Sequence, residues 1–90
     1  MFANFNIAET ESFQKLIKTH PFSSLYPKIK DYVYPRLRQN PFFGPNIKKL
    51  KGDFSSFYRY RIGNHRLFYT INSEKVLVFI VTIKDRKDSY

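Results

Sequence analysis

The chain contains no cysteine, and among its 90 residues only two are histidines and only seven are acidic. Without cysteine the protein has no disulfide bonds, thiolate zinc sites or cysteine nucleophile. Because His20 and His65 are isolated and carboxylates are scarce, we expect neither a bound metal ion nor another cofactor. The longest apolar run, Val76–Val81, has six residues and is too short to cross a membrane. Since Met1–Asn4 also lacks the features of a signal peptide, we expect a soluble, cytoplasmic protein.

Positive charge and aromatic residues are abundant. Sixteen lysines and arginines against seven acids give a formal net charge of +9, and there are ten phenylalanines and seven tyrosines. A chain of this length buries only about 60–65% of its unfolded surface, so its core must be compact. We therefore expect a single domain over residues 1–90. The charge indicates a polyanionic partner, although it does not by itself define a chemistry.

The apolar pattern predicts an α+β fold: an N-terminal strand, two helices and then a three-stranded antiparallel meander. The first strand is expected at Phe5–Ala8, and Thr10 is expected to cap a helix that ends before Pro21. A second helix is predicted by apolar residues spaced four apart, which are Leu25, Ile29, Val33 and Leu37. Pro35 lies inside this pattern, so we expect it to kink or shorten the helix. Phe42 and Phe43 are expected to fasten the following loop onto the core.

The meander is expected at Phe57–Ile62, His65–Ile71 and Val76–Ile83. Between the first two strands, Gly63-Asn64 suits a two-residue type II′ turn. This turn fixes the register of the hairpin, because it places Ile62 opposite His65 and Arg61 opposite Arg66.

The register sorts the hairpin side chains onto two faces. The helix-facing set is Tyr58, Tyr60, Ile62, Leu67, Tyr69 and Ile71. The other set is Phe57, Arg59, Arg61, Arg66 and Phe68. Directly opposed like charges destabilise a sheet, so the second set favours a phosphate-binding site with rings that stack on bases. A solvated basic face is the alternative interpretation.

Further charge precedes the hairpin at Lys48, Lys49 and Lys51, which we expect to bind a nucleic acid together with Phe57 and Phe68. The segment from Lys28 to Arg66 holds ten basic and two acidic residues, +8 of the total +9. The two histidines are weaker candidates. His65 is expected to be partly buried beside the turn and not to act as a general base, and His20 to be a helix-terminal residue.

Two stretches resemble the RelE branch of the RelE/ParE toxins. One is Lys49-Leu50-Lys51-Gly52 followed by the hairpin from Tyr58 to Tyr69, and the other is the ending Arg86-Lys87-Asp88-Ser89-Tyr90. The resemblance extends over nearly the whole chain. It implies a toxin of a type II toxin–antitoxin system, an endoribonuclease that cuts mRNA in the ribosomal A site and so inhibits translation. It also implies the partners: mRNA, the ribosome and an acidic, RelB-like antitoxin.

The resemblance further implies the site residues. The catalytic set is Arg59, Arg61, Arg66, Arg86 and Tyr90, with lysines in RelE itself at the first two positions. Lys87, in the closing motif, is expected to bind RNA. Asp85-Arg86 stands where many relatives have His-Arg, so a histidine general base is not available at that position.

These residue types allow metal-independent cleavage by the 2′-OH of the RNA. Arginine stays protonated, so the arginines are expected to stabilise the transition state electrostatically. Tyr90 suits either proton transfer or base stacking. Because the arginine face carries no His, Glu or Asp, we expect poor cleavage of free RNA. Two alternatives stay open: a ParE-like inhibitor of DNA gyrase with the same fold, and a non-catalytic RNA- or ribosome-binding module.

Overall fold

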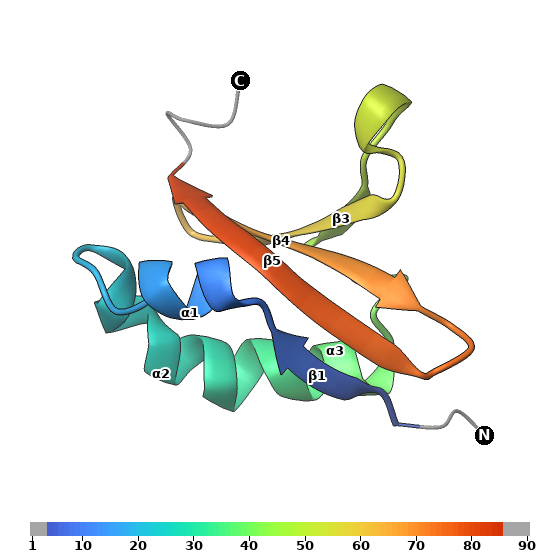
Figure 1. Ribbon diagram of the computed structural model, residues 1–90, viewed down its shortest axis with the longest axis horizontal. Helices are drawn as coiled ribbons and strands as arrows, with labels where there is room; N and C mark the ends of the chain where they lie inside the picture. Colours follow the sequence, from blue (N-terminus) through green and yellow to red (C-terminus); the bar gives the residue numbers. More distant parts are fainter. Residues whose placement is uncertain (1–3, 86–90) are drawn as a thin grey trace.

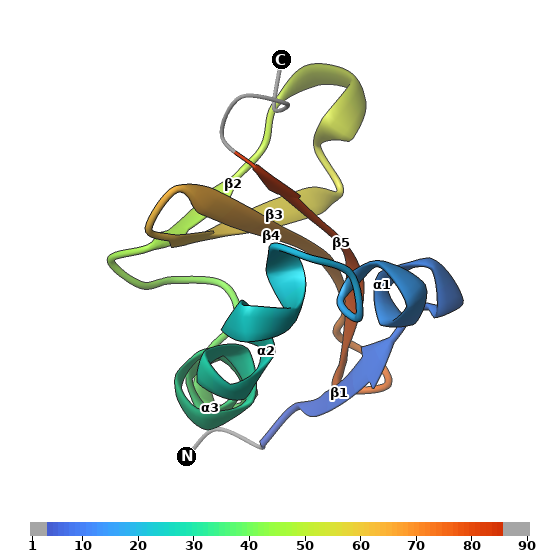
Figure 2. The same cartoon turned by 90° about the vertical axis from the view of Figure 1, so that its left-hand side faces the viewer.

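The computed structural model describes residues 4–85, which form a five-stranded sheet covered on one side by helices (Figures 1 and 2). The strands are β1 (Asn6–Glu9), β2 (Ile47–Lys49), β3 (Phe57–Ile62), β4 (His65–Asn72) and β5 (Leu77–Asp85). Their order is β1-β5-β4-β3-β2, with β1 parallel to β5 and all other neighbours antiparallel. The predicted α+β fold is confirmed. The edge strand β2 is an addition that the sequence pattern did not predict.

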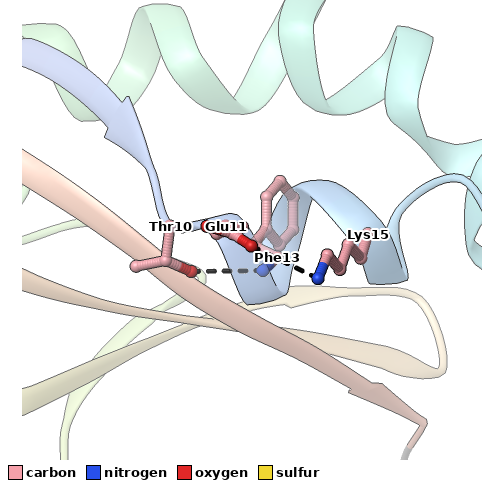
Figure 3. A network of polar contacts seen from close by, with 4 residues as sticks. All are labelled: Thr10, Glu11, Phe13 and Lys15. Carbon is pink, nitrogen blue, oxygen red and sulfur yellow. Dashed lines mark hydrogen bonds and ion pairs between the residues drawn. The ribbon is translucent and has the colours of Figure 1, made fainter.

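Helix α1 (Glu11–Leu16) begins where the sequence predicts. Thr10 Oγ1 accepts a hydrogen bond from the Phe13 N–H at 3.1 Å, which satisfies one of the free amides of the first turn (Figure 3). Figure 3 also shows an ion pair of 3.2 Å between Lys15 and Glu11, one turn apart. The cap therefore fixes the boundary between β1 and α1.

The first helix ends at Leu16, earlier than predicted, because the amide and the hydroxyl of Thr19 both bond to the Leu16 carbonyl. The second helical region consists of η1 (Phe22–Leu25), α2 (Tyr26–Lys28), the π-helical η2 (Ile29–Val33) and α3 (Tyr34–Gln39). The Tyr34 N–H bonds to the Ile29 carbonyl, five residues back. Pro35, which has no N–H, follows this wider turn, so the predicted kink takes the form of a π-helical turn.

The core lies between the helices and the sheet. Its fully buried hydrophobic side chains come from both layers and include Phe13, Ile29, Leu37, Leu67, Tyr69, Val78, Ile80 and Ile83. Of the six hairpin residues predicted to face the helices, four are buried and the others, Tyr58 and Ile71, pack against the core. Phe42 also packs inward, edge-on to Tyr58 at 6.1 Å, but Phe43 is 79% exposed. The prediction that both phenylalanines fasten the loop was therefore wrong for Phe43.

A carboxylate ties the first strand to the second helical region. Glu9, the last residue of β1, accepts hydrogen bonds on Oε2 from Tyr26 Oη at 2.6 Å and from Tyr34 Oη at 2.7 Å. Burial, and then these bonds to Glu9, raise the pKa of Tyr26 to about 12 and raise that of Tyr34 well above its ordinary value. Burial likewise raises the pKa of Tyr69. The folded state thus favours the neutral phenols.

This preference predicts a loss of stability in alkali. Phenols of the unfolded chain ionise near pH 10, so the contribution of these tyrosines is complete below pH 10 and is lost as the pH rises further. Each phenol that stays neutral in the folded chain but ionises in the unfolded chain makes the free energy of unfolding fall by about 1.4 kcal/mol per pH unit in that range. Urea titrations at pH 9 and pH 11 measure the effect. Tyr34→Phe is expected to reduce the fall in free energy of unfolding between these two pH values. Tyr32→Phe, at a 66% exposed position, is expected to leave that fall unchanged. An equal fall in both variants would contradict the assignment.

No helix within residues 4–85 is long and apolar enough to span a membrane.

Candidate functional site

The β3–β4 hairpin has the predicted register. Ile62 pairs with His65, Arg61 with Arg66 and Arg59 with Phe68. Gly63 begins the turn at a φ of +56°, the left-handed conformation that the first position of a type II′ turn requires. The face that points away from the helices therefore carries the three arginines and both phenylalanines, as expected.

The neighbouring strands add two lysines to this face. On one side β2 places Lys48 opposite Arg59, and on the other β5 places Lys84 opposite Arg66. We call the resulting set the cationic face: Lys48, Arg59, Arg61, Arg66 and Lys84. Arg61, Arg66 and Lys84 form one row across three strands, and side chains that are direct neighbours in such a row have Cβ atoms about 4.5–5.5 Å apart. One phosphate group can therefore contact more than one of these cations.

The cationic residues differ in exposure. Lys48, Arg61 and Lys84 are exposed, whereas Arg59 and Arg66 are half-buried and both take part in interactions of their side chains or backbone. The strand positions that make up this face carry no carboxylate within residues 4–85. Like charges held together on one face create a positive surface, which attracts anions such as phosphate.

A β-bulge places Lys84 on this face. Tyr69 pairs with Ile80 but the preceding Phe68 pairs with Thr82, so Val81 is an extra residue in β5. Without the extra residue, strict alternation from the buried Ile80 would turn Lys84 into the core. The Thr10 hydroxyl donates a hydrogen bond of 3.0 Å to the Val81 carbonyl, and this contact holds the bulge to the start of α1. Bulges that redirect side chains in this way are frequent beside functional sites.

A groove of about 400 Å³ adjoins the cationic face. We call it the aromatic groove, and its lining is Lys48, Lys49, Leu50, Lys51, Phe54, Phe57, Phe68, Thr82 and Lys84. All five residues that the sequence predicts to bind RNA within the described range line this groove. Lys49 stands at the margin, since it pairs with Tyr58 on the other face and its Nζ lies 5.9 Å from the centre of that ring.

Three residues near the site were missed from the sequence: Phe54, Thr82 and Lys84. Thr82 and Lys84 are polar residues two apart at the end of an apolar strand, which is a pattern typical of one exposed face. The spacing of Thr82 and Lys84 predicts that both side chains lie on the same face of the sheet. The bulge that places this pair on the open face has no marker in the sequence. Phe54 lies in η3 (Gly52–Phe54), a short helical turn in the loop between β2 and β3.

The partial burial predicted for His65 is confirmed, whereas His20 lies four residues beyond the end of α1 and is not the helix-terminal residue that the sequence predicted. His65 is half-buried and packs edge-on against Phe22 at 5.7 Å, whereas His20 is exposed in the turn between α1 and η1. Within residues 4–85, no three His, Asp or Glu side chains lie close enough together to hold a metal ion. The expected site residues Arg86, Lys87 and Tyr90 lie outside the described residues.

Comparisons with known proteins agree with this architecture. A family model for the ParE toxin of type II toxin–antitoxin systems, parDE, matches residues 28–90. The toxin–antitoxin complex RelBE2 from Mycobacterium tuberculosis has a chain 21% identical in sequence, with a TM-score of 0.78 and 98% of each chain covered. A mutant of the Escherichia coli toxin RelE in the free state is 22% identical, with a TM-score of 0.75, over 96% of this chain and 87% of that one.

The YoeB/ParE toxin from Agrobacterium tumefaciens is also similar, with a TM-score of 0.71 and 19% identity over 90% of this chain and 98% of that one. A comparison with curated protein sequences gives no match. At these identities the structural likenesses show a shared fold.

Proposed function

The chain belongs to the ParE toxin family of type II toxin–antitoxin systems, within the RelE/ParE superfamily, and from this premise we propose that it is a metal-independent endoribonuclease. As a toxin of such a system it has an antitoxin as its partner. Its proposed substrate is mRNA in the ribosomal A site, so that cleavage inhibits translation. The cationic face is the observation that carries the proposal, because it concentrates phosphate-binding groups beside a groove lined by aromatic rings.

The proposed reaction uses the RNA as its own nucleophile. The 2′-oxygen gives up its proton and attacks the adjacent phosphorus. The bond from phosphorus to the 5′-oxygen then breaks, and that oxygen takes up a proton. The products are a 2′,3′-cyclic phosphate and a 5′-hydroxyl. Negative charge grows on the phosphate oxygens in the transition state, and each well-placed donor can stabilise it by about 3 kcal/mol.

The arginines of the cationic face are proposed to supply this stabilisation, since a guanidinium stays protonated and does not transfer protons. Arg66 lies in the middle of the row, flanked by Arg61 and Lys84. Arg86 and Tyr90 are added to the proposed site from the resemblance of the closing motif. A Tyr90→Phe variant separates the two roles of that tyrosine, because lost cleavage indicates proton transfer and retained cleavage indicates stacking.

Positioning by the ribosome is proposed to be essential. The strand positions of the cationic face offer no carboxylate or imidazole as a base within residues 4–85, so the 2′-OH must be aligned from outside. Correct alignment of reacting groups can account for several orders of magnitude in rate. We expect purified protein to cut a translated message at least about 100-fold faster than the same RNA free in solution. Equal rates would overturn this part of the proposal.

Binding is expected to depend strongly on salt. Four to five phosphate contacts on single-stranded RNA predict that the logarithm of the association constant falls with the logarithm of salt concentration with a slope of roughly −3. Fluorescence anisotropy with a non-cleavable oligoribonucleotide measures this slope. Lys84→Ala should make it less steep by about 0.7, the share of one phosphate. A slope near zero would remove the cationic face from the binding site.

Inhibition of DNA gyrase is the second candidate function, favoured by the description of the matching family as ParE toxins. One protein preparation can separate the two. We expect it to stop translation of a reporter message in a cell-free system and to leave gyrase supercoiling unchanged at the same concentration. Inhibited supercoiling with intact message would support gyrase inhibition and overturn the endoribonuclease proposal.

A further inference from the structure

We propose that the aromatic groove is a pocket for a single nucleobase, holding the base of the nucleotide next to the scissile phosphate. The inference rests on the proposed function and extends it, because it divides the RNA site into a phosphate-binding part and a base-binding part. The two parts lie side by side on the open face of the sheet.

The rings of the groove come from three elements. Phe57 and Phe68 stand on β3 and β4 and form its floor, and Phe54 belongs to η3 in the loop after β2. Phe54 and Phe57 meet edge-on, with ring centres 6.4 Å apart. Figures 1 and 2 show this loop projecting from the side of the sheet opposite the helices, and Phe54 does not belong to the main core. A phenylalanine that is 62% exposed at such a place is available to a ligand.

The loop that carries Phe54 is fixed at both ends. The Leu50 N–H donates to the Phe57 carbonyl at 3.0 Å, which continues the ladder between the two strands. The Ser55 N–H donates to the Gly52 carbonyl at 3.1 Å and closes the helical turn. Gly52 has a φ of +68°, a conformation that favours glycine. The Phe54 ring is therefore presented by a defined turn.

The size and charge of the groove favour a base over other occupants. Its volume of about 400 Å³ is near the lower end of the range for small-ligand pockets, and it is too small for a helix. Four of its lining residues are the lysines Lys48, Lys49, Lys51 and Lys84, and none is acidic. An apolar side chain of a protein partner would not require a lining rich in lysine. A nucleotide satisfies both features, because it joins a flat ring to a phosphate.

The register also places the two parts at a suitable separation. Phe68 follows Arg66 by two residues on β4, so both side chains are on the open face, about 7 Å apart along the strand. A base resting on Phe68 thus leaves its own phosphate beside the row of Arg61, Arg66 and Lys84. Stacking on phenylalanine is tolerant of sequence, and Thr82 is the hydroxyl in the lining that can hydrogen-bond to a base edge.

A double-mutant cycle tests the pocket directly. The probe is a trinucleotide RNA blocked by a 2′-O-methyl group at the cleavage position, compared with the same probe lacking one base in turn at each position. Affinities are measured for the wild type, Phe54→Ala and the control Phe43→Ala, which removes a 79% exposed ring from another loop. We expect Phe54→Ala to weaken binding of the intact probe by about 5- to 100-fold, and Phe43→Ala to leave it unchanged.

The cycle gives a decisive readout because groups in contact couple, whereas distant and independent groups have additive effects. At one probe position, removal of the base should lower the affinity of the wild type. Removal of the same base should change the affinity of Phe54→Ala very little. Phe57→Leu provides a second variant within the same groove. Equal losses at every position in both proteins would overturn the pocket even if RNA binds, whereas no RNA binding by the wild type would overturn the proposed function itself. If Phe54→Ala binds the RNA probes as tightly as the wild type but binds the antitoxin more weakly, the groove would be reassigned to the antitoxin.

Discussion

Arg66→Ala is expected to slow mRNA cleavage on translating ribosomes by about 100- to 1,000-fold, the usual effect of removing one transition-state donor. Arg66 stands between Arg61 and Lys84 in the row that spans three strands. It is half-buried, so its guanidinium is held by its surroundings better than an exposed lysine would be. Its neighbours keep attracting phosphate after the substitution, and the loss should therefore appear in the rate of the chemical step more than in RNA affinity.

Single-turnover kinetics on ribosomes programmed with one defined codon measure this effect. The matched control is Arg36→Ala, which removes the same charge from an exposed position on α3, in the helical layer. Arg66→Lys keeps the charge but loses the planar pair of donors, so we expect an intermediate rate. A wild-type rate for Arg66→Ala, with Arg36→Ala equally active, would exclude the cationic face as the site of catalysis.

The second prediction concerns two adjacent residues of β5 and follows from the bulge at Val81. Ile83→Lys should destabilise the protein by at least about 4 kcal/mol, because Ile83 is 1% exposed and the new charge would be buried without a partner. Lys84→Ile should keep the fold, since Lys84 is exposed on the open face, and should weaken RNA binding. Without the bulge, strict alternation would give the opposite outcome at both positions.

Urea titrations of the two variants measure their free energies of unfolding, and anisotropy measures the affinity of Lys84→Ile for RNA. The pair forms its own control, because both substitutions exchange the same two residue types one position apart. A stable Ile83→Lys together with an unfolded Lys84→Ile would show that β5 runs without the bulge. The Thr10 contact to Val81 would then have no role in positioning Lys84.

The hairpin was predictable because its determinants are local. Gly63 supplies the left-handed conformation of the turn, and the alternation from Tyr58 to Tyr69 assigns each side chain to a face. Once the turn is identified, no long-range information is needed to bring Arg61 and Arg66 together. The N-cap at Thr10 was predictable for the same reason, since it depends on an amide three residues away.

The missed features depend on contacts between distant parts of the chain. β2 is a strand of only three residues, and two of them are lysines next to a loop rich in proline and glycine. It becomes a strand because β3 offers it a free edge. The bulge at Val81 has no proline or glycine to mark it, and its carbonyl is bonded by Thr10, 71 residues earlier. Lys84 could therefore be recognised as polar but not assigned to the cationic face.

Glu9 illustrates a different limit. Its position beside Thr10 is typical of a helix cap, yet its carboxylate bonds to Tyr26 and Tyr34 in the second helical region. An acid next to a helix start can take either role. The packing of β1 against the second helical region decides which role Glu9 takes. The carboxylate thereby stabilises the layer that supports the sheet and is not part of the proposed site.

Primer extension on a translated message tests the central claim most directly. Cells express the wild type, Arg66→Ala or Arg36→Ala, and new 5′ ends are mapped on a message whose start codon is either intact or mutated. We predict new ends within the codons of the translated message for the wild type and Arg36→Ala, and none for Arg66→Ala or for the untranslated message. Intact message in cells that instead show DNA damage and filamentation would contradict the account.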